Sequence, residues 1–147
     1  MNIRNISLSE TRRIRLEVLR PGRPASEVAY PGDESALAEH LGAFEAGRLV
    51  AIATFVPEAC PGVDGVDAWR LRGMATVPSA RGRGLGGQLL THGVARTLRL
   101  GASLIWCHGR TSARTFYERH EFRAVGDEFV TPHTGPHFLF VRGGGSG

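Results

Sequence analysis

The sequence predicts an α/β (α+β) fold in which helices flank a central mixed, mostly antiparallel sheet of six to seven strands. Short apolar segments of strand length recur along the chain, and segments with helical apolar spacing lie between them. Glycine or proline interrupts the chain between most of these segments, as is typical of loops. Because 147 residues suit one domain, we expect a single domain over residues 1–142 and a flexible glycine- and serine-rich tail over residues 143–147.

The expected elements follow from these patterns in chain order. Ser7 or Ser9 can cap a helix that Pro21 ends, and the turn Ala46-Gly47 between two apolar segments indicates a hairpin. The expected strands are Asn2–Ile6, His40–Glu45, Arg48–Val56, Asp67–Val77, Ala102–Cys107, Phe122–Val125 and Gly135–Val141. The other expected helices are a short one over Asp33–Glu39, one from Leu85 to the stop at Gly101, and one that Thr111 or Ser112 caps and that ends at His120.

The composition excludes several classes of protein. The apolar fraction of 41% and the charged fraction of 22% are typical of a globular chain and not of a disordered one. The longest mainly apolar run without glycine, Leu49–Val56, is far shorter than the roughly 20 residues of a membrane span, and the N-terminus lacks the apolar core of a signal peptide. Two cysteines, Cys60 and Cys107, are too few for a disulfide framework. We therefore expect a cytoplasmic protein with no membrane partner.

Positive charge is concentrated in the middle of the chain. All 18 basic residues are arginine, so there is no lysine to form a Schiff base, bind phosphate or act as a general base. The segment from Ala68 to Tyr117 lacks Asp and Glu but contains eight arginines: Arg70, Arg72, Arg81, Arg83, Arg96, Arg99, Arg110 and Arg114. This segment is expected to attract a polyanion. A nucleic-acid-binding module is one alternative, but the aromatic residues are not spaced for base stacking, so we expect no nucleic-acid partner.

A glycine-rich loop, Arg81–Gly87, lies between an expected strand and the start of an expected helix. Free backbone N–H groups and the positive end of the helix dipole make such a loop an anion site. A phosphate-loop NTPase is excluded because the loop lacks the required lysine. Gly82, Gly84 and Gly87 match a dinucleotide-binding pattern, but the acidic residue expected roughly 20 positions later is missing. The pyrophosphate of coenzyme A is the third candidate.

Two motifs identify a resemblance to a known family. The segment Met74–Gly86 resembles the central motif of the GNAT N-acetyltransferase superfamily, Arg/Gln-x-x-Gly-x-Gly/Ala, through Arg81, Gly84 and Gly86. The segment Ser112–Phe122 is similar to the second motif of the family, Ala-x-x-Phe-Tyr-x-x-x-Gly-Phe. The chain departs from the family at Glu121, where glycine is usual, and at Arg110, where many members have asparagine against the pantetheine.

The resemblance implies a GNAT fold whose sheet splays apart at its parallel strand pair, with acetyl-CoA as co-substrate. The pantetheine arm would lie in that gap against the backbone of β-strand residues, and the glycine-rich loop would hold the pyrophosphate. The expected cofactor-binding residues are Met74, Ala75, Thr76, Arg81, Gly82, Arg83, Gly84, Leu85, Gly86 and Gly87.

The resemblance further implies an N-acetyltransferase that moves an acetyl group from acetyl-CoA to a primary amine by direct attack in a ternary complex. Tyr117 matches the general acid of the family, and a phenol with an ordinary pKa of about 10 can donate a proton to the leaving thiolate. The alternative for Tyr117 is a purely packing role. Glu58, His108 and His137 are the candidate bases for the amine.

Several alternatives stay open. An acyl-CoA-binding sensor domain without transfer would show the same motifs. We expect no metal, because His133 and His137 are separated by glycine and proline and do not share a helix face. Cys107 is predicted to be a core residue, since it and His108 point to opposite faces of a strand. The acceptor amine, the acyl length and the oligomeric state are not predicted, although a homodimer through an exposed sheet edge is one option.

Overall fold

A computed structural model describes residues 2–132 and 134–143 of the chain. It contains one seven-stranded sheet with the strand order β1-β2-β3-β4-β5-β7-β6. The strands are β1 (Asn2–Asn5), β2 (Glu39–Glu45), β3 (Arg48–Pro57), β4 (Ala68–Thr76), β5 (Leu104–Arg110), β6 (Arg123–Thr131) and β7 (Gly135–Gly143). All neighbouring strands are antiparallel except β4 and β5, which are parallel. The predicted mixed, mostly antiparallel sheet is confirmed.

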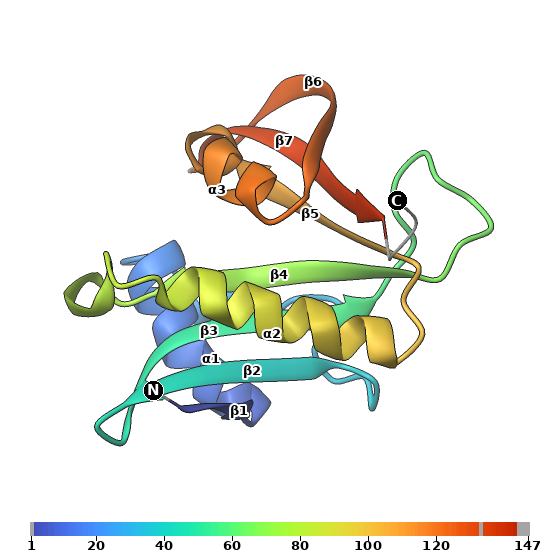
Figure 1. Ribbon diagram of the computed structural model, residues 1–147. Coiled ribbons are helices and arrows are strands. Elements are labelled where there is room, and N and C mark those ends of the chain that lie inside the picture. The colour runs from blue at the N-terminus through green and yellow to red at the C-terminus, as the bar shows by residue number, and fades with distance from the viewer. Residues whose placement is uncertain (1, 133, 144–147) are drawn as a thin grey trace.

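Helices cover both faces of this sheet (Figure 1). One face carries the N-terminal helical segment, and the opposite face carries the two later helices. The helices are α1 (Leu8–Ile14), the π-helical turn η1 (Arg15–Leu19), α2 (Leu85–Arg99), α3 (Arg114–Arg119) and the short 3₁₀ turns η2 (Ala25–Val28), η3 (Pro78–Ala80) and η4 (Thr111–Ala113). Within the part of the chain that the structure describes, no helix is long and apolar enough to cross a membrane.

The main core lies between α2 and the middle of the sheet. Leu89 and Leu90 of α2 are fully buried in one apolar cluster with Phe55 of β3 and Leu71 of β4. A Cβ atom at Gly93 would lie only 2.1 Å from Cε1 of Phe55, so α2 can approach β3 this closely only with glycine at that position. The glycine lowers helix propensity but permits the contact that holds α2 on the sheet.

The N-terminal helix begins as the sequence predicts. Ser7 is the N-cap, its hydroxyl accepts from the Glu10 N–H at 3.2 Å, and the Glu10 carboxylate accepts from the Ser7 N–H at 2.8 Å. The hydrogen bond that the carboxylate accepts from the Ser7 N–H is the main cause of the lowered pKa of Glu10. After Ile14 the helix widens into the π turn, which places Arg15 in the protein interior.

The helix predicted over Asp33–Glu39 is wrong, because the segment forms turns as far as Leu37 and Glu39 already belongs to β2. The Asp33 carboxylate accepts hydrogen bonds from the Tyr30 N–H and from Arg15, and these contacts hold a turn where a helix would need to start. The bounds of the last strands also differ from the prediction: β5 was predicted over Ala102–Cys107 and runs from Leu104 to Arg110, and β6 was predicted to end at Val125 and continues to Thr131. Gly143, expected in the tail, belongs to β7, and residues 144–147 lie outside the described part of the chain.

The sheet splays apart between β4 and β5. The two strands pair only at Ala68–Leu104, Trp69–Ile105 and Arg70–Trp106, after which they diverge although both continue. At the same level β4 contains a bulge, since its register against β3 shifts between Ile52 and Thr54, and Gly73 adopts a φ of +61°. The splayed parallel pair implied by the family resemblance is therefore present (Figure 1).

Candidate active site

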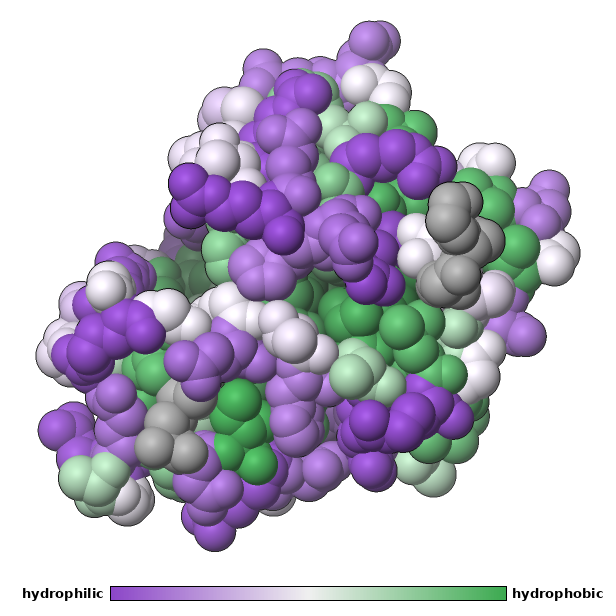
Figure 2. Space-filling model, in the orientation of Figure 1, coloured by the Kyte–Doolittle hydropathy of each residue, from purple (hydrophilic) through white to green (hydrophobic). Residues whose placement is uncertain are grey.

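The opening between β4 and β5 leaves one edge of β4 without a strand partner. In the described chain, β4 beyond Arg70 pairs only with β3, so the backbone of Leu71–Thr76 that faces β5 is free to pair with an extended ligand. One group is already engaged, because the Thr76 carbonyl accepts from Nε of Arg81 at 3.1 Å. Figure 2 shows the surface hollowed between the part of the molecule that holds α2 and the part that holds α3.

The glycine-rich loop ends at this opening. Gly84 is the N-cap of α2 with a φ of +75°, and Gly82 has a φ of +83°. No atom lies within 4 Å of a Cβ built at either position, so the left-handed backbone, and not crowding, calls for glycine. The first turn of α2 has no acidic residue and no side-chain cap, so its N–H groups point outward without a helical acceptor. This arrangement suits an anion.

Gly86 and Gly87 serve a different purpose. A Cβ at Gly86 would lie 3.3 Å from Cε of Met74, and a Cβ at Gly87 would lie 3.1 Å from Nε2 of His120. The first turn of α2 is therefore packed tightly between β4 and the end of α3. Small residues here keep the helix N-terminus beside the opening.

Half of the arginines in the acid-free segment have carboxylate partners from elsewhere in the chain or from its border. Ion pairs join Arg70 to Glu58, Arg83 to Glu45, Arg96 to Glu39 and Arg114 to Glu118. The expected polyanion field is therefore weaker than the sequence suggests, because acids distant in sequence fold onto these arginines. Arg83 in particular points toward the turn between β2 and β3, where Glu45 holds it.

Tyr117 packs on β5 just beyond the point where β5 leaves β4. Its ring stacks on Phe140 with 4.7 Å between the centroids, and a Cβ at Gly109 would lie 2.6 Å from its Cε2 atom. Burial, and then the neighbouring Cys107, raise the pKa of Tyr117 well above its ordinary value. The phenol is thus held in its protonated form at the edge of the opening.

Cys107 is a core residue, as predicted. Its side chain is buried in the main apolar cluster, whereas the adjacent His108 is exposed on the other side of β5. Burial raises the pKa of the Cys107 thiol to about 12, so it is not a thiolate at neutral pH.

The candidate bases lie on the face of the sheet opposite α2. Glu58 forms an ion pair with Arg70 at 2.9 Å, and an Arg70 nitrogen lies 3.4 Å from Nδ1 of His108. Desolvation, followed by the charge of Arg70, lowers the pKa of His108. His137 is buried, and its Nδ1 lies 2.7 Å from the Gly135 carbonyl. Phe129 links the two histidine rings, with centroid distances of 5.2 Å to His108 and 5.8 Å to His137.

Sequence reasoning did not find a buried polar cluster on this same face. Arg15 is fully buried and donates to both carboxylate oxygens of Asp33, at 2.8 and 3.0 Å, and to the hydroxyl of Thr54. Burial by itself would raise the pKa of Asp33, but the hydrogen bonds from Arg15 and Tyr30 lower it overall. The guanidinium groups of Arg15 and Arg72 lie 4.3 and 4.5 Å from the centroid of the Tyr30 ring. No local motif signals these contacts.

Comparison with known proteins decides the family. A family model described as an acetyltransferase (GNAT) domain matches residues 36–124, more than half of the chain. The chain belongs to the GNAT acetyltransferase family. An N-acetyltransferase of Bacillus subtilis (strain 168), YitI, described as uncharacterized, is 30% identical over 142 residues, which cover 97% of this chain and 95% of that protein. Transferase activity is thus the activity of the family to which the chain belongs.

Solved GNAT structures agree with the observed fold. ElaA of Escherichia coli superposes with a TM-score of 0.79 at 16% identity, covering 96% of this chain and 98% of that chain. A putative N-acetyltransferase of Lactobacillus plantarum gives 0.77 at 18% identity, covering 98% and 99%. An aminoglycoside 6'-N-acetyltransferase complexed with coenzyme A gives 0.72 at 15% identity, covering 97% of each chain.

The departure from the GNAT motif at Glu121 does not change the backbone. Glu121 adopts the left-handed conformation usual for glycine, with a φ of +70°. The Glu121 N–H donates to the Glu118 carbonyl and the Phe122 N–H to the Tyr117 carbonyl, so the turn after α3 is a complete Schellman motif. Arg110, the other departure, is exposed at the end of β5.

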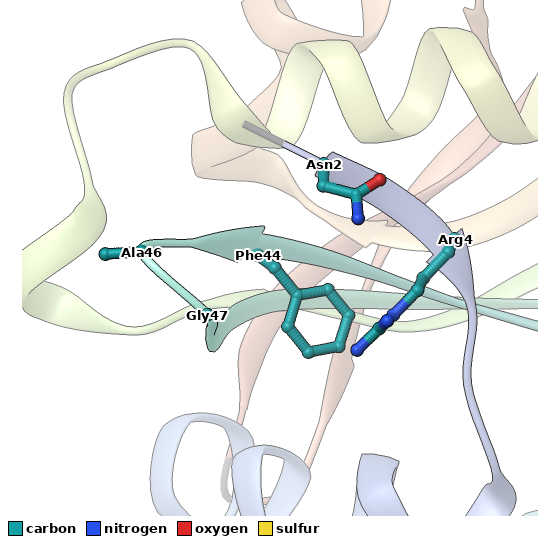
Figure 3. Close-up of a pocket in the computed structure, with 5 residues that line it drawn as sticks. All are labelled: Asn2, Arg4, Phe44, Ala46 and Gly47. Carbon is teal, nitrogen blue, oxygen red and sulfur yellow. The ribbon is translucent and has the colours of Figure 1, made fainter.

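Two further features lie away from this site. A cavity of about 300 Å³ is lined by Asn2, Arg4, Phe44, Ala46 and Gly47, with Arg4 over the Phe44 ring, at the far edge of the sheet (Figure 3). None of the predicted site residues lines it. His133, one member of the His133 and His137 pair, lies outside the described residues, and the described ones contain no cluster of three metal-ligating side chains.

Proposed function

We propose that this GNAT protein transfers an acetyl group from acetyl-CoA to a primary amine that attacks the thioester directly in a ternary complex. The observation that carries the proposal is the opening between β4 and β5, which has a helix start without a side-chain cap on one face and the polar side chains of Glu58, Arg70 and His108 on the other. An extended cofactor bound there would separate the two faces, so the amine would approach from the side opposite α2.

The backbone carries most of the proposed cofactor binding. The backbone edge of Met74, Ala75 and Thr76 would pair with the pantetheine amides through groups other than the Thr76 carbonyl, which Arg81 holds. The N–H groups from Gly82 to Gly87 would bind the pyrophosphate. Leu85 is buried against Ala80 and fixes the first turn of α2. Arg81 has no acidic partner among the described residues, whereas Arg83 is held by Glu45, so Arg81 is the arginine of the loop that would contact the pyrophosphate. The coenzyme A complex of the aminoglycoside 6'-N-acetyltransferase, which shares this fold, supports the choice of cofactor.

Tyr117 is the proposed proton donor. The amine nitrogen attacks the carbonyl carbon, the new C–N bond forms, and the C–S bond breaks as sulfur takes the phenol proton. A raised pKa keeps the phenol protonated before this step.

Of the three candidate bases, His108 fits the task best. Its lowered pKa keeps the imidazole neutral at neutral pH, and it is exposed on the side from which the amine would arrive. Glu58 holds Arg70, and the ring of His137 is buried. We therefore assign to His108 the proton that the nitrogen loses. His108 then releases this proton to solvent and solvent returns a proton to Tyr117, so both side chains and the charges are restored.

Release of free thiol from acetyl-CoA, measured across a panel of primary amines, tests the proposal. We expect amine-dependent release that saturates with both substrates and shows intersecting initial-rate lines, as a ternary complex requires. Parallel lines would contradict direct attack. If calorimetry showed that coenzyme A binds but no amine caused release of free thiol, the result would instead favour an acyl-CoA-binding sensor domain.

A further inference from the structure

Arg15, Arg70 and Arg72 form a group on the face of the sheet opposite α2, and only two of these three arginines are matched by acids. Arg15 pairs with Asp33 at 2.8 Å, and Arg70 pairs with Glu58 at 2.9 Å. Arg72 is half-buried, yet the described residues give it neither a hydrogen bond nor an ion pair. The group thus keeps one net positive charge, located at Arg72.

The guanidinium of Arg72 is held in place without using its N–H groups. It lies 4.5 Å from the centroid of the Tyr30 ring, and the same ring contacts the guanidinium of buried Arg15 at 4.3 Å. The Tyr30 N–H donates to Asp33, so the loop that presents the ring is anchored to the ion pair below. Stacking occupies the flat face of a guanidinium and leaves its edge donors free for a planar anion.

Arg72 lies beside the opening between β4 and β5, where the proposed transfer takes place. It directly precedes Gly73, the bulge residue at the level where β4 leaves β5. Leu71, its neighbour on the strand, packs in the cluster with α2, so Arg72 points to the other face. The cofactor phosphates would lie on the α2 side, where Arg72 cannot reach them. An anion that meets Arg72 therefore comes from the acceptor.

We infer that the acceptor amine carries a carboxylate and that Arg72, with Arg70 beside it, binds that carboxylate. The inference rests on the proposed function and names the substrate class of the same site. One net positive charge on the cluster matches a carboxylate better than the nearly double charge of a phosphate. The planar donor edge fits a carboxylate in two parallel hydrogen bonds.

The test compares the standard amino acids with their carboxamides as acceptors for wild-type protein, Arg72→Gln and Arg99→Gln. Arg99 is an exposed arginine at the far end of α2 and serves as the matched control. We expect the best amino acid to exceed its amide in kcat/KM by roughly ten- to a hundredfold, the effect of a hydrogen bond to a charged group. Arg72→Gln should abolish this preference, mainly through KM, and Arg99→Gln should keep it.

Calorimetric binding of the same pairs to protein saturated with coenzyme A gives a readout that needs no turnover. Tighter binding of the acid than of the amide, lost in Arg72→Gln, supports the inference even where transfer is absent and the proposed function fails. Equal affinity for acid and amide in wild-type protein overturns it, and so does a preference that survives in Arg72→Gln. The comparison in wild-type protein holds even if the variant does not fold.

Discussion

The two faces of the sheet differ in how their functional residues are brought together. On the α2 face, a continuous segment from Met74 to Gly87 supplies the free strand edge, the glycine-rich loop and the helix start. On the opposite face, Arg15, Tyr30, Glu58, Arg72 and His108 come from five separate segments. The first face is made by local backbone geometry and the second by long-range side-chain contacts. Substitutions should therefore act differently on the two.

The largest effect is expected from breaking the buried ion pair on the second face. Arg15→Met leaves the buried carboxylate of Asp33 without its partner, which should destabilise the protein by about 3–5 kcal/mol. Arg13→Met is the control, because Arg13 pairs with Glu17 on the surface and should cost less than about 1 kcal/mol. Urea unfolding measures both variants.

The ion pair also predicts an acid dependence. Since the pKa of Asp33 is lowered in the folded state, the stability from this carboxylate is present above its unfolded pKa and is lost as pH falls through the folded one. Arg15→Met should show a weaker loss on acidification than wild-type protein. Equal stability of the Arg15 and Arg13 variants would mean that the buried cluster does not organise this face.

The first face should respond to a change in loop backbone. Gly84→Val introduces a branched Cβ at a φ of +75° and should lower the affinity for coenzyme A by at least about tenfold, since the N–H groups no longer converge. Gly62→Val matches it, with a φ of +76° and equally open surroundings in a distant loop. Both variants should be destabilised by similar amounts, but only Gly84→Val should bind coenzyme A more weakly when the affinity is measured by calorimetry. Equal affinities would place the phosphates elsewhere.

The second face also determines the pH dependence of the reaction. With His108 as base, kcat/KM should fall tenfold per pH unit on the acid side, with an apparent pKa below the ordinary 6.5, because the pKa of His108 is lowered. His108→Gln should remove this limb. Glu58→Gln should shift it to still lower pH, because the Glu58 charge opposes the lowering. If Glu58→Gln abolished the acid limb of the kcat/KM profile, Glu58 would be the base.

The smallest effect is expected at residues other than glycine whose backbone adopts the left-handed conformation that favours glycine. Glu121→Gly removes the strain of a φ of +70° but also an exposed ion pair with Arg142, so thermal unfolding should show a gain of up to about 1 kcal/mol. Ala46→Gly, at a φ of +49° in the β2–β3 turn, has no ion pair and isolates the backbone contribution. If Glu121→Gly lost stability and Ala46→Gly did not, the ion pair with Arg142 would contribute more to stability than the backbone strain at Glu121 costs.

The same contrast explains how far the sequence could be interpreted. The helix cap, predicted at Ser7 or Ser9 and found at Ser7, the turn at Ala46 and the loop at Gly84 are local features, and the sequence predicted each of them. The turn at Asp33 was wrongly predicted as a helix. The contact that holds this turn comes from Arg15, 18 residues earlier in the chain. Short spacing rules cannot detect such pairs. For the same reason the charge of the arginine-rich segment was overestimated.

The central claim is that the protein catalyses transfer with Tyr117 as proton donor. Tyr117→Phe removes one oxygen and keeps the ring that stacks on Phe140, so stability and coenzyme A affinity should stay within about 0.5 kcal/mol of wild type. Loss of a general acid should lower kcat by roughly 10²–10³.

The decisive measurement is kcat of wild type and Tyr117→Phe with the same amine from pH 6 to pH 11, a range that spans the ordinary phenol pKa of about 10. Because the pKa of Tyr117 is raised, the wild-type rate should hold past pH 10 before it falls, whereas the variant should be uniformly slow. An unchanged kcat in Tyr117→Phe would contradict the account, since solvent would then protonate the thiolate and Tyr117 would be a packing residue.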